Sequence, residues 1–234
     1  MTLSDLRKQL RKQASAERAE VSLRFFKTGP GEYGEGDQFL GLSVPQVRAL
    51  LPWTDDLAEK EVLSLLHSQW HEERLLALLI LVRRFAKAQK NEEARARIVA
   101  LYLKNTRWIN NWDLVDTSAP LILGEWLKTR TRDVLDTLAK SKSLWEQRIA
   151  VLATLAFIRA GEFDDTWRLC ERFLTHEHDL MHKACGWMLR EAGNRDRQVL
   201  RSFLDDHASR MPRTMLRYAI EKLPEAERRK YLGR

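Results

Sequence analysis

Glycine and proline are scarce in this chain, with 10 and 6 residues among 234. Stretches that alternate apolar and polar side chains, as half-buried strands do, are also few. Apolar residues instead recur almost throughout at the spacing of amphipathic helices. These absences exclude a fold built mainly on β-strands and predict an all-α protein.

Cysteine and long hydrophobic runs are scarce as well. Cys170 and Cys185 lie in helical patterns and lack the spacing of a metal site, so we expect buried thiols in a reducing compartment. The longest apolar run, 75–82, is far too short to span a bilayer. The polar first residues hold no apolar core of a signal peptide. We therefore expect a cytoplasmic protein without a membrane-spanning segment.

Positive charge is in excess. The net charge is +7 and the sequence pI is about 9.5, which favours polyanions such as nucleic acid as partners. An apolar fraction of 44% is ordinary for a globular protein with a core. The composition thus predicts a folded protein that binds an acidic partner.

We predict a single domain over 1–234, with N-terminal helices and a loop over 1–45 and repeats over 46–234. The loop is the segment "KTGPGEYGEGDQFLGLSVP" of residues 27–45, from Lys27 to Pro45, whose glycines and prolines prevent a continuous helix. Although it is glycine-rich, it lacks the Gly-Lys-Ser/Thr ending of a phosphate-binding loop. We therefore expect no nucleotide site there.

A pattern of polar residues followed by an apolar helix repeats after this loop. Its five copies are "EERLLALLILVRR", "NWDLVDTSAPLILG", "EQRIAVLATLAFIR", "HKACGWMLREAG" and "PRTMLRYAIEKL". The intervals hold further amphipathic segments, such as "DDLAEKEVLSLLHS" and "FDDTWRLCERFLTH". Two antiparallel helices per roughly 30–45 residues are typical of a HEAT-like α-solenoid. We expect a right-handed superhelix whose second helices line one concave, basic face.

Aligning the five copies brings four basic residues and one acid to equivalent positions. The basic residues predict a groove that neutralises the phosphates of a duplex. The alternative is a solvated charge pattern at the helix starts. The basic row consists of Arg74, Arg148, Lys183 and Arg213, with Arg190, Arg195 and Arg217 nearby.

Asp113 is the acid in this row, and it follows Trp112 directly. One interpretation is a helix cap. The other is a carboxylate aimed into a cationic groove, where it stabilises positive charge or orients a water. Tryptophans in helices mostly belong to the core, but Trp108, Trp112 and Trp187 could also form aromatic walls that pack against a sugar or base.

Histidines 176, 178 and 182 stand close together, but no further ligand follows at zinc spacing. We interpret this segment as a connecting loop and expect neither a metal nor a cofactor. A solenoid wrapped around DNA also needs no second subunit, so we expect a monomer.

Five segments in this order resemble those of the AlkD-type DNA alkylation repair proteins, a family of HEAT-like repeat DNA glycosylases. The resemblance covers nearly the whole chain, from about residue 23 to 232. The segments are "RFFKTGPGEYGEGDQFLGLSVPQVR", "NNWDLVD", "LWEQRIAVLATLAFIR", "HKACGWMLREAG" and "MPRTMLRYAIEKL".

The resemblance implies a superhelix that holds duplex DNA on its concave face and hydrolyses the N-glycosidic bond of cationic N3- or N7-alkylated purines. The family is thought to do so without flipping the damaged base into a pocket, unlike most glycosylases. Its Trp-Asp pair carries the catalytic aspartate, which matches Asp113. A groove arginine matches Arg148, and a wall tryptophan matches Trp187.

This chain departs from the family pattern at one wall. A second tryptophan stands one turn before the aspartate in active members, and Ile109 occupies that position here, between Trp108 and Trp112. Ile109 favours an alternative function, a non-catalytic HEAT-repeat protein that binds damaged or branched DNA by charge. A protein–protein scaffold is a third possibility. Asp113, Arg148 and Trp187 together favour the glycosylase.

Overall fold

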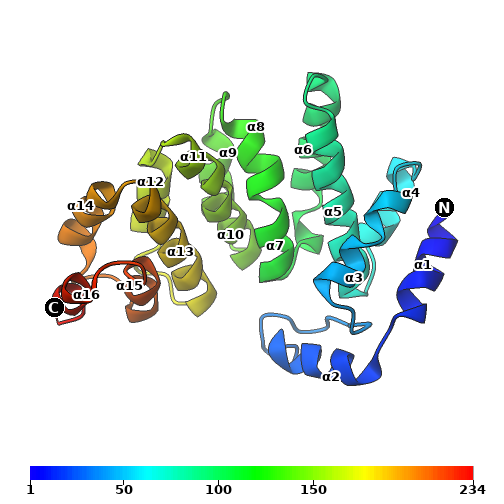
Figure 1. The fold of residues 1–234 in the computed structure, drawn as a ribbon, viewed down its shortest axis with the longest axis horizontal. Coiled ribbons are helices and arrows are strands. Elements are labelled where there is room, and N and C mark those ends of the chain that lie inside the picture. Colours follow the sequence, from blue (N-terminus) through cyan, green and yellow to red (C-terminus); the bar gives the residue numbers. More distant parts are fainter. Residues whose placement is uncertain (234) are drawn as a thin grey trace. The chain divides into compact units, whose positions relative to one another are not determined.

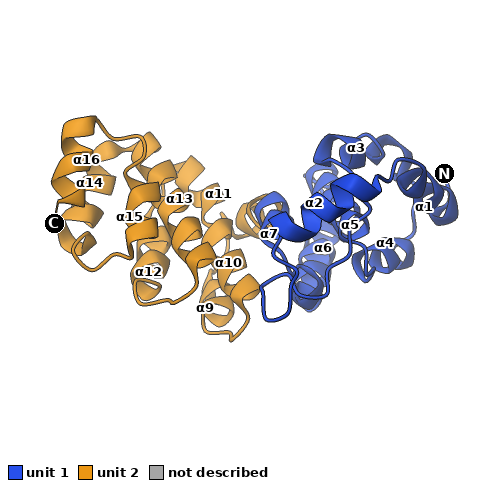
Figure 2. Ribbon diagram, turned by 90° about the horizontal axis from the view of Figure 1, so that it is seen from below, with its two compact units in different colours: residues 1–118 blue, residues 119–234 orange. Residues whose placement is uncertain are grey.

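A computed structural model describes residues 1–233, which are helical and contain no β-sheet (Figure 1). The chain divides into two compact units, unit 1 with Met1–Ser118 and unit 2 with Ala119–Arg234 (Figure 2). The predicted all-α fold of paired, HEAT-like helices is confirmed. The single domain and the concave face stay predictions. Among residues 1–233, no helix combines the length and apolar character needed to cross a membrane.

Unit 1 begins with two short helices, α1 (Leu3–Lys12) and α2 (Ala16–Phe25). Each begins with a hydroxyl that accepts a backbone N–H of the first turn. The hydroxyl of Thr2 accepts the N–H of Asp5 in α1, and that of Ser15 accepts the N–H of Arg18 in α2. Whereas α1 buries two leucines, α2 has no buried side chain. The first helix therefore belongs to the core, and the second lies on its surface.

Helix α5 is the centre of unit 1. Every side chain over residues 71–81 is buried, on all sides of the helix, because α3, α4, α6 and α7 pack around it. The elements after α2 are α3 (Val44–Arg48), η1 (Leu51–Trp53), α4 (Glu59–Leu66), α5 (His71–Lys87), α6 (Glu92–Lys104), η2 (Thr106–Trp108) and α7 (Trp112–Ser118).

The glycine-rich loop runs between α2 and α3, over residues 26–43, within two residues of the predicted bounds. Its second half returns to α5, where Gln38 and Trp70 form an isolated parallel bridge. The N–H of His71 donates to the carbonyl of Gln38 at 2.8 Å. This bridge places the loop against the start of the most buried helix of the unit.

Unit 2 consists of helix pairs that match the predicted repeats. Helix α9 packs on α10, and α12, α14 and α15 pack on α13. The two free cysteines, in α12 and α13, are buried as predicted. The elements of unit 2 are η3 (Pro120–Gly124, a π-helical turn), α8 (Glu125–Leu127), α9 (Asp133–Ala139), α10 (Leu144–Ala153), α11 (Leu155–Ala160), α12 (Asp164–Arg172), α13 (Asp179–Arg195), α14 (Arg197–His207), α15 (Arg213–Ala219) and α16 (Glu225–Leu232).

Replacing Gly41 by alanine should destabilise the protein, because the loop passes very close to α2 there. A Cβ at Gly41 would lie 2.2 Å from the carbonyl oxygen of Ser15, at a φ of +81°. Gly31 is a matched control with a φ of +76° and open space around it. We expect Gly31→Ala to lower the free energy of unfolding by about 1 kcal/mol and Gly41→Ala by about 3 kcal/mol. Urea denaturation measures both, and equal losses would contradict the close approach.

Candidate functional site

Asp113 lies in the first turn of α7 and is 9% exposed. Its carboxylate turns toward α5, where Oδ2 lies 2.8 Å from Nε2 of His71. The other oxygen, Oδ1, is buried and has no hydrogen-bond partner among the described residues. Asn111 accepts the backbone N–H of Trp112 at 2.9 Å. The carboxylate of Asp113 is therefore bound to a neighbouring helix and retains an unused acceptor.

His71 lies between two carboxylates. Its Nε2 faces Asp113, and its Nδ1 lies 3.1 Å from Oδ2 of Asp37, with only 2% of the residue exposed. A neutral imidazole has one N–H, whereas the imidazolium has two and can donate to both acids. Burial alone would lower the pKa of His71, but the two carboxylates outweigh it and raise the pKa to about 9. His71 is therefore charged at neutral pH.

Asp37 links this histidine to a second cation. Its carboxylate accepts hydrogen bonds from the guanidinium of Arg74 and, at 3.3 Å, from Nδ2 of Asn111. Burial works to raise the pKa of Asp37, but the hydrogen bond from His71 and the charge of Arg74 hold the pKa below its ordinary value. Two carboxylates and two cations thus form a buried, charge-balanced cluster: Asp37, His71, Arg74 and Asp113, called here the acid–base cluster.

The position of Arg74 corrects one expectation. The sequence pattern placed this residue in a row of phosphate contacts, yet it is 2% exposed. Besides bonding to Asp37, its Nη1 donates to the carbonyls of Ser68 at 3.0 Å and Gln69 at 3.2 Å. A guanidinium this deeply buried, and held by Asp37 and two backbone carbonyls, is not exposed to a phosphate. Arg74 therefore supports the acid–base cluster rather than a DNA surface.

Aromatic rings cover the cluster on one side. Trp112 stacks on Phe26 with ring centroids 5.3 Å apart and meets the edge of Phe25 at 5.8 Å. The rings of Phe26 and Phe39 lie 5.0 and 4.6 Å from the imidazole of His71. Phe25 is 61% exposed, so the group reaches the surface. The end of α2, the loop and α7 together supply this aromatic wall.

The two tryptophans that flank Ile109 have different surroundings. Trp108 stacks on His67, with centroids 5.0 Å apart, and carries the guanidinium of Arg107 at 4.8 Å from its ring. Ile109 is fully buried. Of the two neighbours, Trp112 is the one that joins the aromatic wall beside Asp113. Ile109 itself therefore occupies a core position.

His71 and Asp37 were not predicted from the sequence, and neither was Glu72, the residue after His71 in α5. Glu72 is 2% exposed, and its carboxylate accepts the backbone N–H groups of Leu40, Gly41 and Leu42 at 2.9, 2.8 and 3.1 Å. This carboxylate fixes the loop that carries Asp37. A usable signal was present, because the polar residues "HEER" open the helix that holds the longest apolar run of the chain, and buried charges require partners.

The predicted residues of unit 2 divide by exposure. Arg148 in α10 is 4% exposed and donates to the carbonyl of Leu180 at 2.6 Å. Trp187 in α13 is half-buried, and its indole N–H donates to Glu191 at 3.0 Å. Lys183 pairs with Asp179 at 2.7 Å, whereas Arg213 and Arg217 are exposed on α15. The exposed arginines are therefore the more accessible cations of this set.

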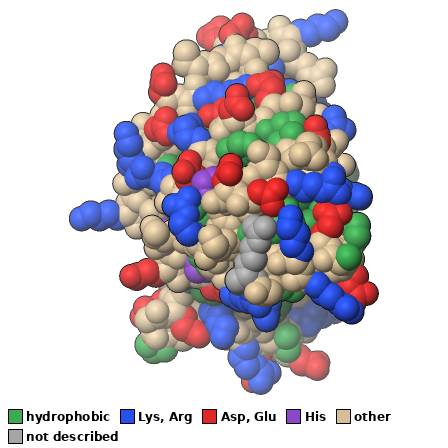
Figure 3. All heavy atoms as spheres, turned by 90° about the vertical axis from the view of Figure 1, so that its left-hand side faces the viewer, with side chains coloured by type: hydrophobic (Ala, Val, Ile, Leu, Met, Phe, Trp, Pro, Cys, Tyr) green, Lys and Arg blue, Asp and Glu red, His purple; other side chains and the backbone are tan. Residues whose placement is uncertain are grey.

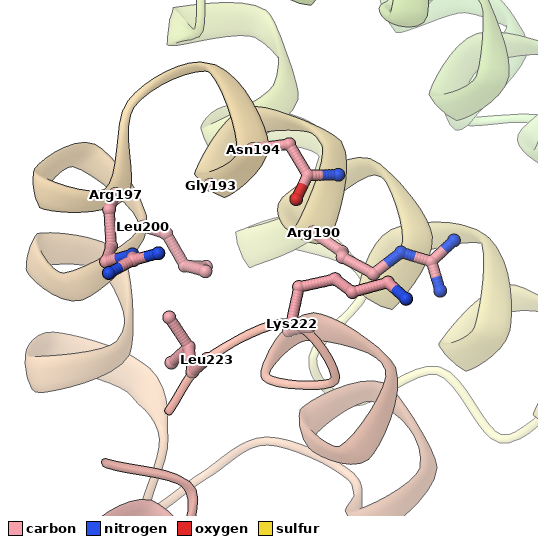
Figure 4. A pocket seen from close by; sticks show the side chains of 8 residues that line it. Arg190, Gly193, Asn194, Arg197, Leu200, Lys222 and Leu223 are labelled. Atoms are coloured by element: carbon pink, nitrogen blue, oxygen red, sulfur yellow. The ribbon is translucent and has the colours of Figure 1, made fainter. Parts of the chain in front are cut away.

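Arg190 lines a pocket of about 110 Å³ between α13, α14 and the segment after α15. Figure 4 shows Arg197 on one side of this pocket and Arg190 and Lys222 on the other, with Leu200 and Leu223 between them. The guanidinium of Arg190 is already paired with Glu221. A phosphate would have to compete with that acid for Arg190.

The end of unit 2 carries charges of both signs. Figure 3 shows Lys and Arg side chains interleaved with Asp and Glu on this side of the molecule. Arg201 pairs with Glu227 at 2.8 Å, and Lys230 lies 3.4 Å from Asp205. Acidic side chains therefore pair with part of the positive charge here.

Two of the three clustered histidines, His176 and His178, lie in the connection between α12 and α13, as predicted, whereas His182 lies in the first turns of α13. His176 bonds to Gln147 at 2.9 Å, and Nδ1 of His178 accepts the N–H of Leu180 as the cap of α13. Within residues 1–233, no three His, Cys, Asp or Glu side chains gather in a way that could hold a metal ion. The segment thus has a structural explanation as a helix start.

His71 should titrate with a midpoint near pH 9, against an ordinary value of 6.5. Because its folded-state pKa is raised, its contribution to stability is complete below about pH 6.5 and is lost as the pH rises through about 9. The pH dependence of its imidazole NMR signals, assigned with His71→Gln, measures the midpoint. A midpoint at or below 6.5 would show that one of the two carboxylate contacts is missing.

Comparisons with known proteins identify the family. The family model of the DNA alkylation repair enzyme matches residues 6–223. A solved structure, a predicted DNA alkylation repair enzyme from Enterococcus faecalis, superimposes with a TM-score of 0.69 at 16% identity, covering 91% of this chain and 98% of its own. That likeness shows a shared fold. No curated protein matches. Because the family model covers most of the chain, the protein belongs to the DNA alkylation repair enzyme family.

Proposed function

We propose that the protein is an alkylpurine DNA glycosylase of the AlkD type, with Asp113 as its catalytic carboxylate. The observation that carries the proposal is the state of this side chain: one oxygen is bound by a charged histidine, and the other is an unused acceptor beside an aromatic wall. A charged carboxylate held in this way in a DNA repair protein is suited to stabilising a cation.

The chemistry follows from the charge of the substrate. Alkylation at N7 or N3 makes the purine cationic, so it leaves as a neutral base with the electron pair of the glycosidic bond. Positive charge then develops on the sugar, as in glycoside hydrolysis. The carboxylate of Asp113 stabilises this charge and orients a water, whose oxygen bonds to C1′ while its proton passes through Asp113 to solvent. A leaving group that is already cationic requires no metal or organic cofactor.

Aromatic faces contribute to substrate binding in this proposal. Trp112 stands next to Asp113 in sequence and contacts the exposed ring of Phe25, so it offers a surface for the sugar or the charged base. Trp187 of unit 2 is half-buried and carries the same proposed role. Trp108 is also half-buried, but it stacks on His67, so any contact with the substrate lies beyond the acid–base cluster.

In this proposal the protein binds duplex DNA as a monomer, and the remaining predicted cations contact the phosphates. They are Lys183, Arg190, Arg213 and Arg217, with Arg148 in a supporting role. The net charge of +7 supports the proposal, as does the exposure of the two arginines of α15. Arg148 is buried, so in this proposal it acts by fixing the backbone at Leu180, in the first turn of α13, which also carries Lys183. Arg74 is left out because it is buried and bonded within unit 1.

Asp113→Asn should lower the release of 7-methylguanine from methylated duplex DNA by about 10²–10³-fold, because it removes one preorganised charge from the transition state. DNA affinity, measured by fluorescence anisotropy, should change little. Asp116→Asn is the matched control, one turn later on α7 and half-buried. Its release rate should stay close to that of the wild type.

A different outcome would favour the second candidate function. Ile109 is fully buried and stands where active members of the resembling family place a wall tryptophan. This chain therefore has no aromatic ring at that position. No release from the wild type, together with binding that weakens steeply with salt, would indicate a non-catalytic module for damaged or branched DNA. Equal release by wild type and Asp113→Asn would remove Asp113 from the mechanism.

A further inference from the structure

We infer that His71 is the positioning residue of this site: its two ring nitrogens join Asp113 to Asp37, and thereby fix Asp113 with Oδ1 as its remaining acceptor. The inference rests on the proposed base release. It assigns to His71 a role in the reaction, although the imidazole itself touches neither DNA nor the reacting atoms.

The surroundings of His71 leave its ring a single orientation. Asp113 of α7 faces Nε2 at 2.8 Å, and Asp37 of the loop faces Nδ1 at 3.1 Å. The rings of Phe26 and Phe39 cover the imidazole. The fourth charge of the cluster is Arg74, one turn along α5, which bonds to Asp37. A rotation of the ring would break both carboxylate contacts, so the histidine fixes Oδ2 of Asp113 as well.

The charge balance of the cluster explains why a histidine matters here. Two buried carboxylates face an imidazolium and a guanidinium. Without the imidazolium, one guanidinium would remain for the two acids, and it bonds to Asp37 and not to Asp113. Asp113 would then lose the ion pair that holds its Oδ2. A carboxylate that is no longer fixed stabilises a cationic sugar less well.

Two variants separate the two contacts of His71. The amide nitrogen of Gln falls near Nε2 of the histidine it replaces, so His71→Gln keeps a neutral donor to Asp113. The amide nitrogen of Asn falls near Nδ1, so His71→Asn keeps the contact to Asp37 and loses the one to Asp113. The control is His67→Gln, since Nε2 of that histidine meets the side-chain oxygen of Asn105 at 2.7 Å rather than a carboxylate.

The experiment is the pH profile of single-turnover release of 7-methylguanine from methylated duplex DNA. In His71→Gln, the fall of the rate on the alkaline side should disappear, because this variant has no imidazole that loses a proton. His71→Asn should lower the maximal rate strongly while DNA affinity changes little. His67→Gln should leave the alkaline limb at its wild-type position.

A purely structural role of His71 predicts something else. Both variants would then lose folded protein, and the alkaline limb of the folded fraction would not move. An unmoved limb in folded His71→Gln overturns the inference and leaves the proposed function standing. If the wild type releases no base, the proposed function and the inference fall together.

A measurement on the wild type keeps the inference testable if neither variant folds. A neutral imidazole has one N–H and holds only one of the two carboxylates. The release rate should therefore fall on the alkaline side with the same midpoint as the NMR titration of His71. A rate that stays constant through that midpoint contradicts the inference.

Discussion

A charged side chain inside a protein needs a partner of opposite sign or a full set of hydrogen bonds, and α5 begins with four such residues in succession, 71–74. Successive helix residues point in different directions, so the four reach different parts of unit 1. His71 reaches α7 and the loop, Glu72 the loop backbone, and Glu73 the arginines of α1, at 2.9 Å for Arg7. The start of this helix therefore fixes the elements around the candidate site.

The same constraint links stability to chemistry. Asp113 is held in place because His71 is charged, and His71 is charged because two acids surround it. The catalytic carboxylate of the proposed reaction is thus part of the scaffold of unit 1. One of its oxygens stabilises the fold, and the other is buried without a hydrogen-bond partner among the described residues. A cationic substrate requires little else from the protein than such a fixed negative charge.

Local patterns predicted the helix pairs, the loop over 27–45 and Asp113, because each depends on residues close together in sequence. The partners of Asp113 could not be found in this way, since His71 lies 42 residues before it and Asp37 another 34 before that. Alignment of the repeats also treated Arg74 as a surface cation, although its helix is surrounded by others. Equivalent sequence position did not mean equivalent exposure, because the depth of a helix depends on its neighbours.

The most direct test of a charged, catalytic Asp113 measures binding to a mimic of the charged sugar. Two duplexes differ only at one position, with a positively charged pyrrolidine in one and a neutral tetrahydrofuran in the other. We expect the wild type to bind the charged analogue more tightly, by a factor on the order of 10², and Asp113→Asn to bind both alike. Equal affinity of the wild type for the two duplexes would contradict the account.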